Sequence, residues 1–225
     1  MLYIIATPIG NLKDISLRAL ETLRQVDGVI CEDSRRASKL LNHFQITKPL
    51  IVLNDYNESK ITPLIIEKLT KEGQNLALIS DAGTPLISDP GYKLVRQAIF
   101  EGISVDSLPG PASPIVALTL SSLPPDKFFF LGYPPEKSGR RQQFYLMIKA
   151  IAEIISTTFI ILVSPHKLTK TLEEIRATFG DIDITLAREL TKIYQTVKTR
   201  KITEWLEEFD KIKPKGEWIM LIRLD

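Results

Sequence analysis

The feature of this chain that most constrains its fold is the regular alternation of short apolar runs with helical patterns over roughly the first 120 residues. The run Leu76-Ala77-Leu78-Ile79, for example, is typical of a strand that is buried on both faces. The expected strands are residues 2–6, 28–31, 50–53, 76–79 and 103–108, and the expected helices are 17–26, 36–43, 57–72, 92–99 and 115–121. Strands and helices that alternate in this way predict an α/β fold with a mostly parallel sheet covered on both faces.

A similar pattern restarts after Pro124-Pro125-Asp126, which we interpret as a linker. The expected strands beyond it are 128–132, 158–163, 182–187, 193–199 and 217–224, and the expected helices are 140–155, 168–179 and 204–209. Thr203 is the expected N-cap of the last helix. Several of these strands are joined without room for a crossover helix, so we expect a mixed second sheet. The chain is therefore predicted to contain two α/β domains, residues 1–123 and 124–225.

The composition excludes several classes of protein and of site. The chain is 44% hydrophobic and 25% charged with a net charge of +2, which is typical of a globular protein and not of a histone-like nucleic-acid binder. The single cysteine, Cys31, excludes an internal disulfide, and His43 and His166 lie far apart, so we expect no metal site. Because no apolar stretch reaches about 20 residues and no leader-like segment is present, we expect no membrane partner and a cytoplasmic location.

The most distinctive loop runs from Ser80 to Gly91, directly after the fourth expected strand. We expect residues 80–87 to hold a ligand, with Asp81 as an acceptor, and Asp89 with Pro90 to cap the helix that follows. Loops 7–14, 32–36 and 109–114 are also rich in small or turn-forming residues, and each follows a strand of the same sheet. Since the carboxyl ends of parallel strands meet at one edge, the four loops are expected to line one cleft.

The chemistry of this cleft is narrowed by the motifs that the chain lacks. There is no Walker A motif, no GxGxxG motif after the first strand and no GxSxG motif. A pocket of small-residue loops with a few carboxylates suits a bound organic cofactor that itself carries the reactive group.

Five motifs extend over nearly the whole chain, namely TPIGNLKDIS (7–16), EDSR (32–35), SDAGTPLISDPG (80–91), LPGP (108–111) and ARELTK (187–192). In this order they resemble the tetrapyrrole-methylase-like superfamily, and within it the branch that methylates the ribose 2′-hydroxyl of a cytidine in 16S ribosomal RNA. The chain departs from that branch where Ala6 replaces its usual glycine, where Ser34 replaces its usual threonine, and where Ala112-Ser113 stands in place of its usual Ser-Ala pair.

The resemblance implies S-adenosylmethionine as the cofactor, bound in a cleft between the two domains, and usually a homodimer. Residues 1–123 would supply the substrate side and the cofactor loop, and residues 124–225 would close the cleft. The implied partner is 16S ribosomal RNA, which we expect to be presented within the assembled small subunit.

The resemblance also assigns candidate cofactor residues. Those in the first half are Pro8, Asp81, Ala82, Gly83, Thr84, Ala112 and Ser113, and those in the second half are Ala187, Gly216 and Glu217. Ala112 and Ser113 open a helix, where backbone N–H groups are free to bind polar ligand atoms. An ordinary helix cap is an equally good interpretation of that pair. Pro8 is equally well interpreted as a helix-entry turn, and the second-half residues as a strand end or a hairpin turn.

Methyl transfer to a ribose hydroxyl requires removal of its proton, so a general base or a charge-stabilising cation is expected. The candidates are Arg188, Glu189 and Lys192, and the sequence does not choose among them. Candidate substrate residues are Asn11, Glu32, Asp33, Arg35, Tyr133, Arg140 and Arg141. A turn at Asn11, a salt-bridged helix start at 32–35 and an ordinary surface loop at 133–141 are the competing interpretations.

Two other functions remain open from the sequence. One is a methyltransferase of the same fold that acts on a tetrapyrrole or another small molecule. The other is a non-enzymatic module that binds S-adenosylmethionine. The long 80–91 loop and the ARELTK motif favour the RNA enzyme over the first of these.

Overall fold

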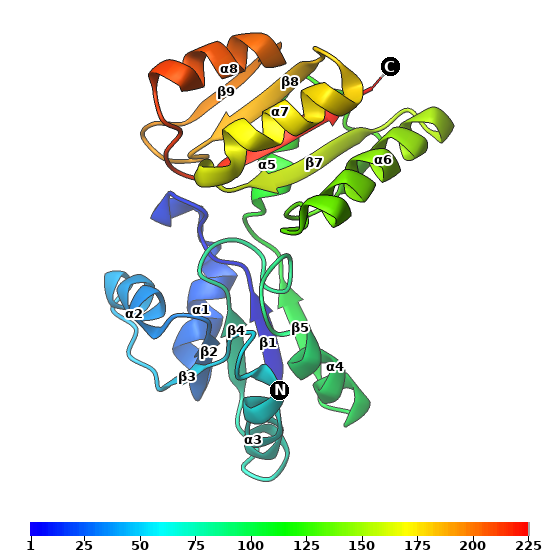
Figure 1. The fold of residues 1–225 in the computed structure, drawn as a ribbon. Coiled ribbons are helices and arrows are strands. Elements are labelled where there is room, and N and C mark those ends of the chain that lie inside the picture. Colours follow the sequence, from blue (N-terminus) through cyan, green and yellow to red (C-terminus); the bar gives the residue numbers. More distant parts are fainter. Residues whose placement is uncertain (225) are drawn as a thin grey trace. The chain divides into compact units, whose positions relative to one another are not determined.

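The computed structural model describes residues 1–224 and divides into two compact units, Met1–Ala112 and Ser113–Asp225 (Figure 1). Each unit contains a five-stranded sheet. None of the helices within residues 1–224 combines the length and the apolar composition that a bilayer span requires.

The sheet of the first unit is entirely parallel and has the strand order β3-β2-β4-β1-β5. Its strands are β1 (Leu2–Ile5), β2 (Gly28–Cys31), β3 (Leu50–Val52), β4 (Leu76–Ile79) and β5 (Val105–Leu108). They are joined by α1 (Leu17–Gln25), α2 (Ser34–His43), α3 (Glu58–Thr70) and α4 (Tyr92–Phe100), and a short 3-10 helix, η1 (Leu12–Asp14), precedes α1. The parallel sheet predicted from the alternating pattern is confirmed.

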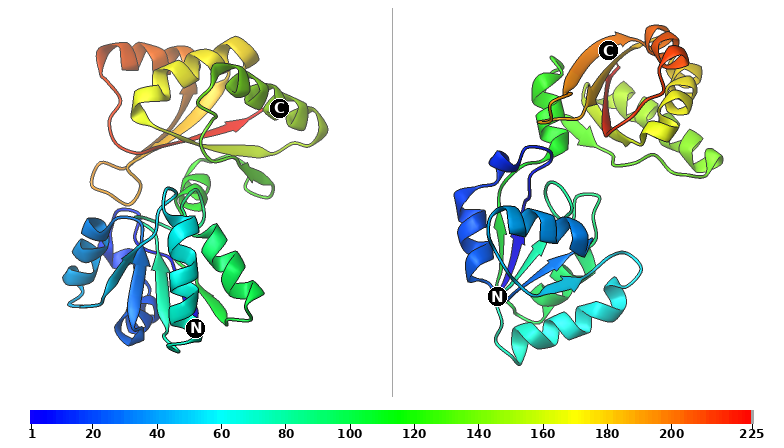
Figure 2. Two further views of the ribbon diagram at one scale, coloured as in Figure 1. Left: turned by 60° about the horizontal axis from the view of Figure 1, so that its bottom comes forward. Right: turned by 90° about the vertical axis from the view of Figure 1, so that its left-hand side faces the viewer.

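Each face of this sheet is covered by a different pair of helices (Figure 2). On one face, α1 and α2 pack through Leu23 and Leu41 against a cluster that includes Ile79. On the other face, α3 and α4 pack through residues such as Leu94 against a cluster that includes Leu78. The strand β4 lies between β2 and β1. The helices that follow β1 and β2, α1 and α2, cover one face of the sheet, whereas α4, which follows β4, covers the other. Ligands bind at such switch points in parallel sheets, at the carboxyl ends of the strands.

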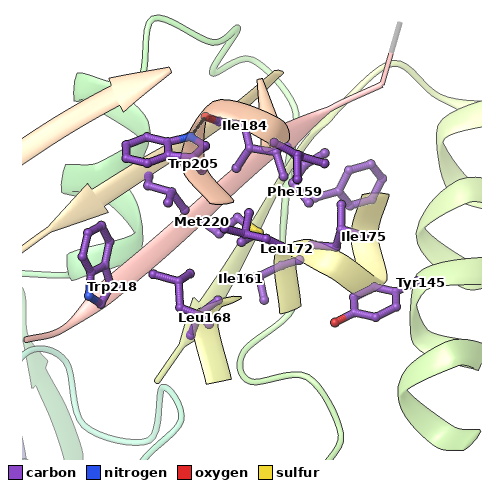
Figure 3. Packing of buried hydrophobic residues seen from close by; sticks show 14 of the residues in the cluster. Tyr145, Phe159, Ile161, Leu168, Leu172, Ile175, Ile184, Trp205, Trp218 and Met220 are labelled. Atoms are coloured by element: carbon purple, nitrogen blue, oxygen red, sulfur yellow. Dashed lines mark hydrogen bonds between the residues drawn. The ribbon is translucent and has the colours of Figure 1, made fainter. Parts of the chain in front are cut away.

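The second unit has a mixed sheet of order β6-β7-β10-β8-β9. Its strands are β6 (Phe128–Phe130), β7 (Thr158–Val163), β8 (Asp183–Arg188), β9 (Thr196–Lys201) and β10 (Trp218–Arg223), and its helices are α5 (Ser113–Leu120), α6 (Ser138–Ile154), the 3-10 helix η2 (Pro165–Lys167), α7 (Leu168–Phe179) and α8 (Ile202–Lys211). Only β6 and β7 pair in parallel. Figure 3 shows the core, in which Trp205 of α8 packs beside the strands and its indole N–H donates to Ile184 O at 3.1 Å.

The boundary between the units lies earlier than the predicted one at 123/124, because α5 belongs to the second unit. This helix is apolar around its whole circumference and contacts β10, and its residues Ala117 and Leu118 are buried. The second sheet covers the side of α5 that carries Ala117 and Leu118, and this packing places the helix in the second unit.

Two predicted helix caps are wrong. The N-cap of α4 is Gly91, and the buried Glu58 of α3, not Asp89, accepts hydrogen bonds from the N–H groups of Gly91 at 3.0 Å and Lys93 at 2.9 Å. The helix α8 begins at Ile202, before the expected cap Thr203. There, Asp181 accepts the Thr203 N–H at 2.9 Å. In both places a carboxylate distant in sequence binds the backbone, and residue spacing does not reveal such a partner.

Glu58 provides a test of this capping arrangement. Glu58→Ala leaves two N–H groups at the start of α4 without their acceptor, and we expect a loss of about 2–3 kcal/mol in the free energy of unfolding. Glu58→Gln retains an acceptor oxygen and should lose less. The measurement is urea denaturation, with Glu67→Ala, an exposed carboxylate of the same helix, as the control that changes stability by less than about 0.5 kcal/mol. Equal losses for Glu58→Ala and Glu67→Ala would contradict the capping role.

Candidate active site

The loop after β4 is joined to the loop after β1 by a short antiparallel bridge. The Thr7 N–H donates to Gly83 O at 2.8 Å, and the Gly83 N–H donates to Thr7 O at 3.0 Å. The buried Thr7 hydroxyl donates to Ser80 O at 3.2 Å, and the Ser80 hydroxyl donates to Gly83 O at 3.1 Å. The Thr84 hydroxyl donates to Pro111 O at 3.1 Å. Three of the four small-residue loops are therefore connected at one edge of the sheet.

The fourth loop, after β2, joins this edge through Asp81. One carboxylate oxygen of Asp81 accepts the Asp33 N–H at 3.3 Å, and the other lies 3.3 Å from Arg36 Nε. The prediction that the four loops converge at the carboxyl ends of the strands is confirmed.

The course of these loops depends on residues with unusual backbone angles. Gly83 has a φ of +92°, and Leu86 and Ser88, with φ of 71° and 67°, also lie in the left-handed region that favours glycine. A Cβ at Gly110 would lie only 2.8 Å from the Cβ of Ala6. Because the Ala6 Cβ occupies this space, only a glycine at position 110 fits beside it.

Three carboxylates make this edge of the sheet electronegative. Burial, together with the nearby carboxylates of Glu32 and Asp81, raises the pKa of Asp89 to about 6. Burial also raises the pKa of Glu32, with a contribution from Asp81. For Asp81 itself, burial raises the pKa while the guanidinium of Arg36 opposes the rise. Carboxylates held in this state suit a ligand that brings positive charge.

Asp33 and Arg35 bind each other at the start of α2. One Asp33 oxygen accepts the Arg35 N–H at 2.8 Å and Nε at 3.0 Å, and the other accepts a terminal guanidinium nitrogen at 2.6 Å. These hydrogen bonds from Arg35 lower the pKa of Asp33 to about 2. Asn11 caps η1 by accepting the Lys13 N–H at 3.1 Å. Both arrangements match the structural interpretations of these motifs, and substrate contact by Asn11, Glu32, Asp33 and Arg35 stays a prediction.

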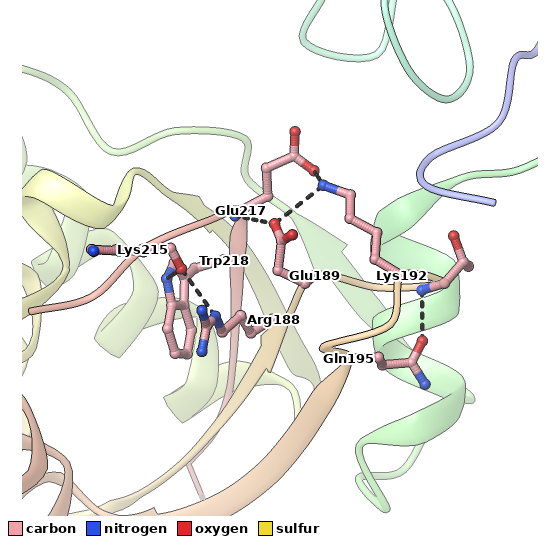
Figure 4. A network of polar contacts seen from close by, with 8 residues as sticks. Arg188, Glu189, Lys192, Gln195, Lys215, Glu217 and Trp218 are labelled. Carbon is pink, nitrogen blue, oxygen red and sulfur yellow. Dashed lines mark hydrogen bonds and ion pairs between the residues drawn. The ribbon is translucent and has the colours of Figure 1, made fainter. Parts of the chain in front are cut away.

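In the second unit, the ARELTK motif forms a polar network with the start of β10 (Figure 4). One oxygen of Glu189 accepts the Glu217 N–H at 2.9 Å and lies 3.1 Å from Lys192 Nζ, which also donates to Glu217 at 2.8 Å. Gly216 has a φ of +87°, and a Cβ there would meet the Glu189 carboxylate at 2.6 Å. The network therefore requires glycine at position 216.

This network fixes the protonation states of two candidate catalytic residues. Desolvation opposes the ionised form of Lys192, but the hydrogen bonds to Glu217 and Glu189 outweigh it and raise the pKa of the ammonium. For Glu189, desolvation is likewise outweighed, by the Glu217 N–H and by Lys192, so its pKa is lowered. Lys192 is thus a protonated cation, and Glu189 is a poor proton acceptor. Arg188 lies over the Trp218 ring and donates from Nε to Lys215 O at 2.9 Å.

The prediction that Arg141 contacts substrate is corrected by its surroundings. The side chain is buried, and its guanidinium makes two bonds to Glu174, at 2.5 and 2.6 Å, and donates to Glu136 O at 2.7 Å and Pro135 O at 3.1 Å. These bonds hold the backbone of the loop before α6 and occupy the side chain. Its neighbour Arg140 is exposed.

The loop that Arg141 holds forms one wall of a cavity of about 490 Å³ within the second unit. Tyr133, with 60% of its surface exposed, lines this cavity together with Lys167 and Lys170. An aromatic ring beside cationic groups is compatible with the RNA contact predicted for Tyr133, and that contact stays a prediction.

The remaining cofactor candidates are distributed over several elements. Pro8 lines a cavity of about 380 Å³ in the first unit, and Ala82 is exposed. Ser113 is the first residue of α5, directly after Ala112, and Ala187 is fully buried opposite Ile219 of β10. Among the described residues, no group of three or more histidine, cysteine, aspartate or glutamate side chains could hold a metal ion.

The sequence interpretation missed α2 as a wall of the Pro8 cavity. Arg36, Lys39 and His43 line it from that helix. Their spacing of three and four residues places them on one helix face, and this spacing was the available signal.

A parallel sheet with four small-residue loops at its switch point, followed by a mixed second sheet, defines a two-sheet α/β protein with a candidate ligand site at its strand ends. The model of the family described as Tetrapyrrole (Corrin/Porphyrin) Methylases matches residues 1–205, and the chain belongs to this family.

Relatives with assigned names are similar over almost the whole chain. The chain is 46% identical over 226 residues to the ribosomal RNA small subunit methyltransferase I of Haemophilus influenzae, with 99% of this chain and 78% of that protein covered. It is 43% identical over 216 residues to the protein of the same name from Thermotoga maritima, with coverages of 96% and 95%. The crystal structure of diphthine synthase matches with a TM-score of 0.78 at 17% identity, covering 99% of this chain and 89% of that one, which shows the shared fold.

The raised pKa of Asp89 predicts a pH-dependent stability. Because its folded-state pKa of about 6 lies above the unfolded value, Asp89 destabilises the fold progressively as the pH rises from about 4 through 6. Asp89→Asn should therefore increase the free energy of unfolding at pH 7.5 by about 1–2 kcal/mol and have little effect near pH 4. Denaturant unfolding at both pH values measures this. Glu21→Gln, an exposed carboxylate of the same unit, should change stability by less than about 0.5 kcal/mol at either pH. If Asp89→Asn changed the free energy of unfolding by the same amount at both pH values, the prediction would be contradicted.

Proposed function

We propose that this chain is an S-adenosylmethionine-dependent methyltransferase that methylates the ribose 2′-hydroxyl of a cytidine in 16S ribosomal RNA. The observation that carries this proposal is the identity of 46% and 43%, over nearly the whole chain, to proteins named ribosomal RNA small subunit methyltransferase I. The resemblance of the 80–91 loop and the ARELTK motif to the cytidine-methylating branch supports the choice of the ribose oxygen and of cytidine.

The loop residues at the carboxyl edge of the first sheet fit such a cofactor. Asp81, Ala82, Gly83 and Thr84 are proposed to hold its methionine part, because Ala82 is exposed on the loop and the bonds between Gly83 and Thr7 hold the loop in place. When bound, the cofactor supplies an electrophilic methyl group on a sulfonium centre. The raised pKa values of the carboxylates at this edge fit a ligand with that positive charge.

Further cofactor contacts are proposed from both units. Pro8 would line the site beside Thr7, and Ala112 with Ser113 would present backbone groups at the start of α5. Ala187, Gly216 and Glu217 are the residues proposed to contact the adenine, as the resemblance implies.

The polar network at Lys192 supports a role in the methylation step. The 2′-hydroxyl is a weak acid, and its proton has to leave as the oxygen becomes methylated. Lys192, kept protonated by Glu189 and Glu217, is proposed to stabilise the negative charge that develops on this oxygen. Glu189 then positions the ammonium, and Arg188, fixed against Trp218, adds positive charge beside it.

The proposed substrate also defines the partners. We propose the assembled small subunit as the form in which the RNA is presented, because a protein with a net charge of +2 gains specificity from shape more than from charge alone. A cytoplasmic location and a homodimer accompany this proposal.

The function is tested by incubating the purified protein and labelled S-adenosylmethionine with small ribosomal subunits from cells that lack the corresponding gene. Mass mapping of the 16S RNA should then show one new methyl group on the ribose of a cytidine. A methylated base, or activity on a porphyrinoid with none on RNA, would refute the assignment. If calorimetry detects no binding at millimolar cofactor, every S-adenosylmethionine-dependent role is excluded.

Lys192→Met should lower kcat by about tenfold to a hundredfold, because it removes one charge-stabilising group. The affinity for S-adenosylmethionine should change little, and Lys192→Arg should retain part of the activity. Single-turnover methylation and calorimetry measure the two effects, with Lys198→Met, an exposed lysine of β9, as the control. An unchanged kcat in Lys192→Met would exclude the proposed role.

A further inference from the structure

The cavity of about 380 Å³ in the first unit has walls of two chemical kinds. Pro8, Leu12 and Leu40 contribute apolar surface, and Leu12 is 37% exposed. The other side is formed by three side chains of α2 together with the first two residues of the loop after β4, namely Arg36, Lys39, His43, Ser80 and Asp81. The cavity therefore shares two residues with the proposed cofactor loop.

The helix α2 presents its charged face to this cavity because its apolar face is buried. Ala37 and Leu41 pack into the core beneath the helix. Arg36, Lys39 and His43 are exposed and recur at intervals of three and four residues. Such a stripe on a helix is often no more than a solvated face, but here all three side chains border one cavity.

The charges in the cavity are only partly balanced. Arg36 pairs with Asp81, at 3.3 Å between Nε and the carboxylate. Within residues 1–224, Lys39 and His43 form no ion pair. Two groups able to donate to an anion therefore stand beside an apolar wall, at the sheet edge where the reaction is proposed to occur.

We propose that this cavity binds one nucleotide of the RNA strand next to the methylated one. This inference rests on the proposed function and adds a subsite to it. Lys39 and His43 bind the phosphate, and the base or sugar packs against Leu12 and Leu40. Cations that track the backbone combined with surfaces that cover bases are the features by which proteins hold single-stranded RNA. An apolar wall alone would match only the base or sugar of a nucleotide, and a cationic wall alone would match only its phosphate.

The test measures the Kd of the full-length protein for small ribosomal subunits as a function of KCl concentration. Lys39→Ala and the double variant Lys39→Ala/His43→Ala should weaken binding by about threefold to thirtyfold, the double variant more than the single one, and the loss of the Lys39 charge should reduce the slope of log Kd against log salt by about one unit. Leu12→Ser should weaken binding without changing that slope, because it removes only apolar contact. The control Lys60→Ala removes an exposed lysine from α3, on the opposite face of the sheet, and should change neither quantity.

Calorimetry with S-adenosylmethionine and thermal unfolding accompany each variant, and both should match the wild type. An unchanged Kd and salt slope in the double variant would overturn the subsite, even if methylation continues. An equal effect of Lys60→Ala would also overturn it, because it would indicate general electrostatic attraction. A wild-type protein that binds small subunits but transfers no methyl group would refute the proposed function separately, since the binding measurement does not depend on methylation.

Discussion

The candidate site of the first unit depends on the pair of hydrogen bonds between Thr7 and Gly83. Through this bridge the loops after two adjacent parallel strands become one surface, and the hydroxyls of Thr7, Ser80 and Thr84 extend it to a third loop. The hydroxyls of Thr7 and Thr84 satisfy the backbone carbonyls of Ser80 and Pro111, and the Ser80 hydroxyl is a second donor to Gly83 O. The loop after β4 is long, yet it is fixed by bonds to its neighbours, and this rigidity is what a preorganised ligand site requires.

The two units hold their charged groups in opposite ways. At the edge of the first sheet, burial raises the pKa values of Glu32, Asp81 and Asp89, and the charge of Asp81 adds to the rise at the other two, so this edge favours added positive charge. In the second unit, Lys192 is surrounded by Glu189 and Glu217 and remains protonated. The first arrangement favours the binding of a cationic ligand, whereas the second holds a cation of the protein itself between two carboxylates.

Sequence interpretation succeeded where the evidence is local and failed where a side chain acts at a distance. Ser16, for example, caps α1 by accepting the N–H of Ala19, only three positions away, and a contact of this range can be recognised in a sequence. Arg141 was interpreted as an RNA contact because it lies in a basic run, but Glu174, 33 residues away, binds it in the interior. Similarly, Asp89 has the right spacing to cap α4, yet Glu58 performs that role from another helix. A charged residue on a loop has the same appearance in sequence whether it faces solvent or a buried partner.

The sequence by itself determined the α/β class, the parallel first sheet, the mixed second sheet and the convergence of four loops at one edge. It did so because apolar periodicity and glycine–proline punctuation reflect local backbone preferences. Its motifs also determined the family. Only the tertiary structure decided that α5 belongs to the second core, that Lys192 stays charged and that Asp89 titrates near pH 6. Each of these properties is set by burial and by charges brought close together by the fold, and neither distance nor dielectric environment is encoded in residue spacing.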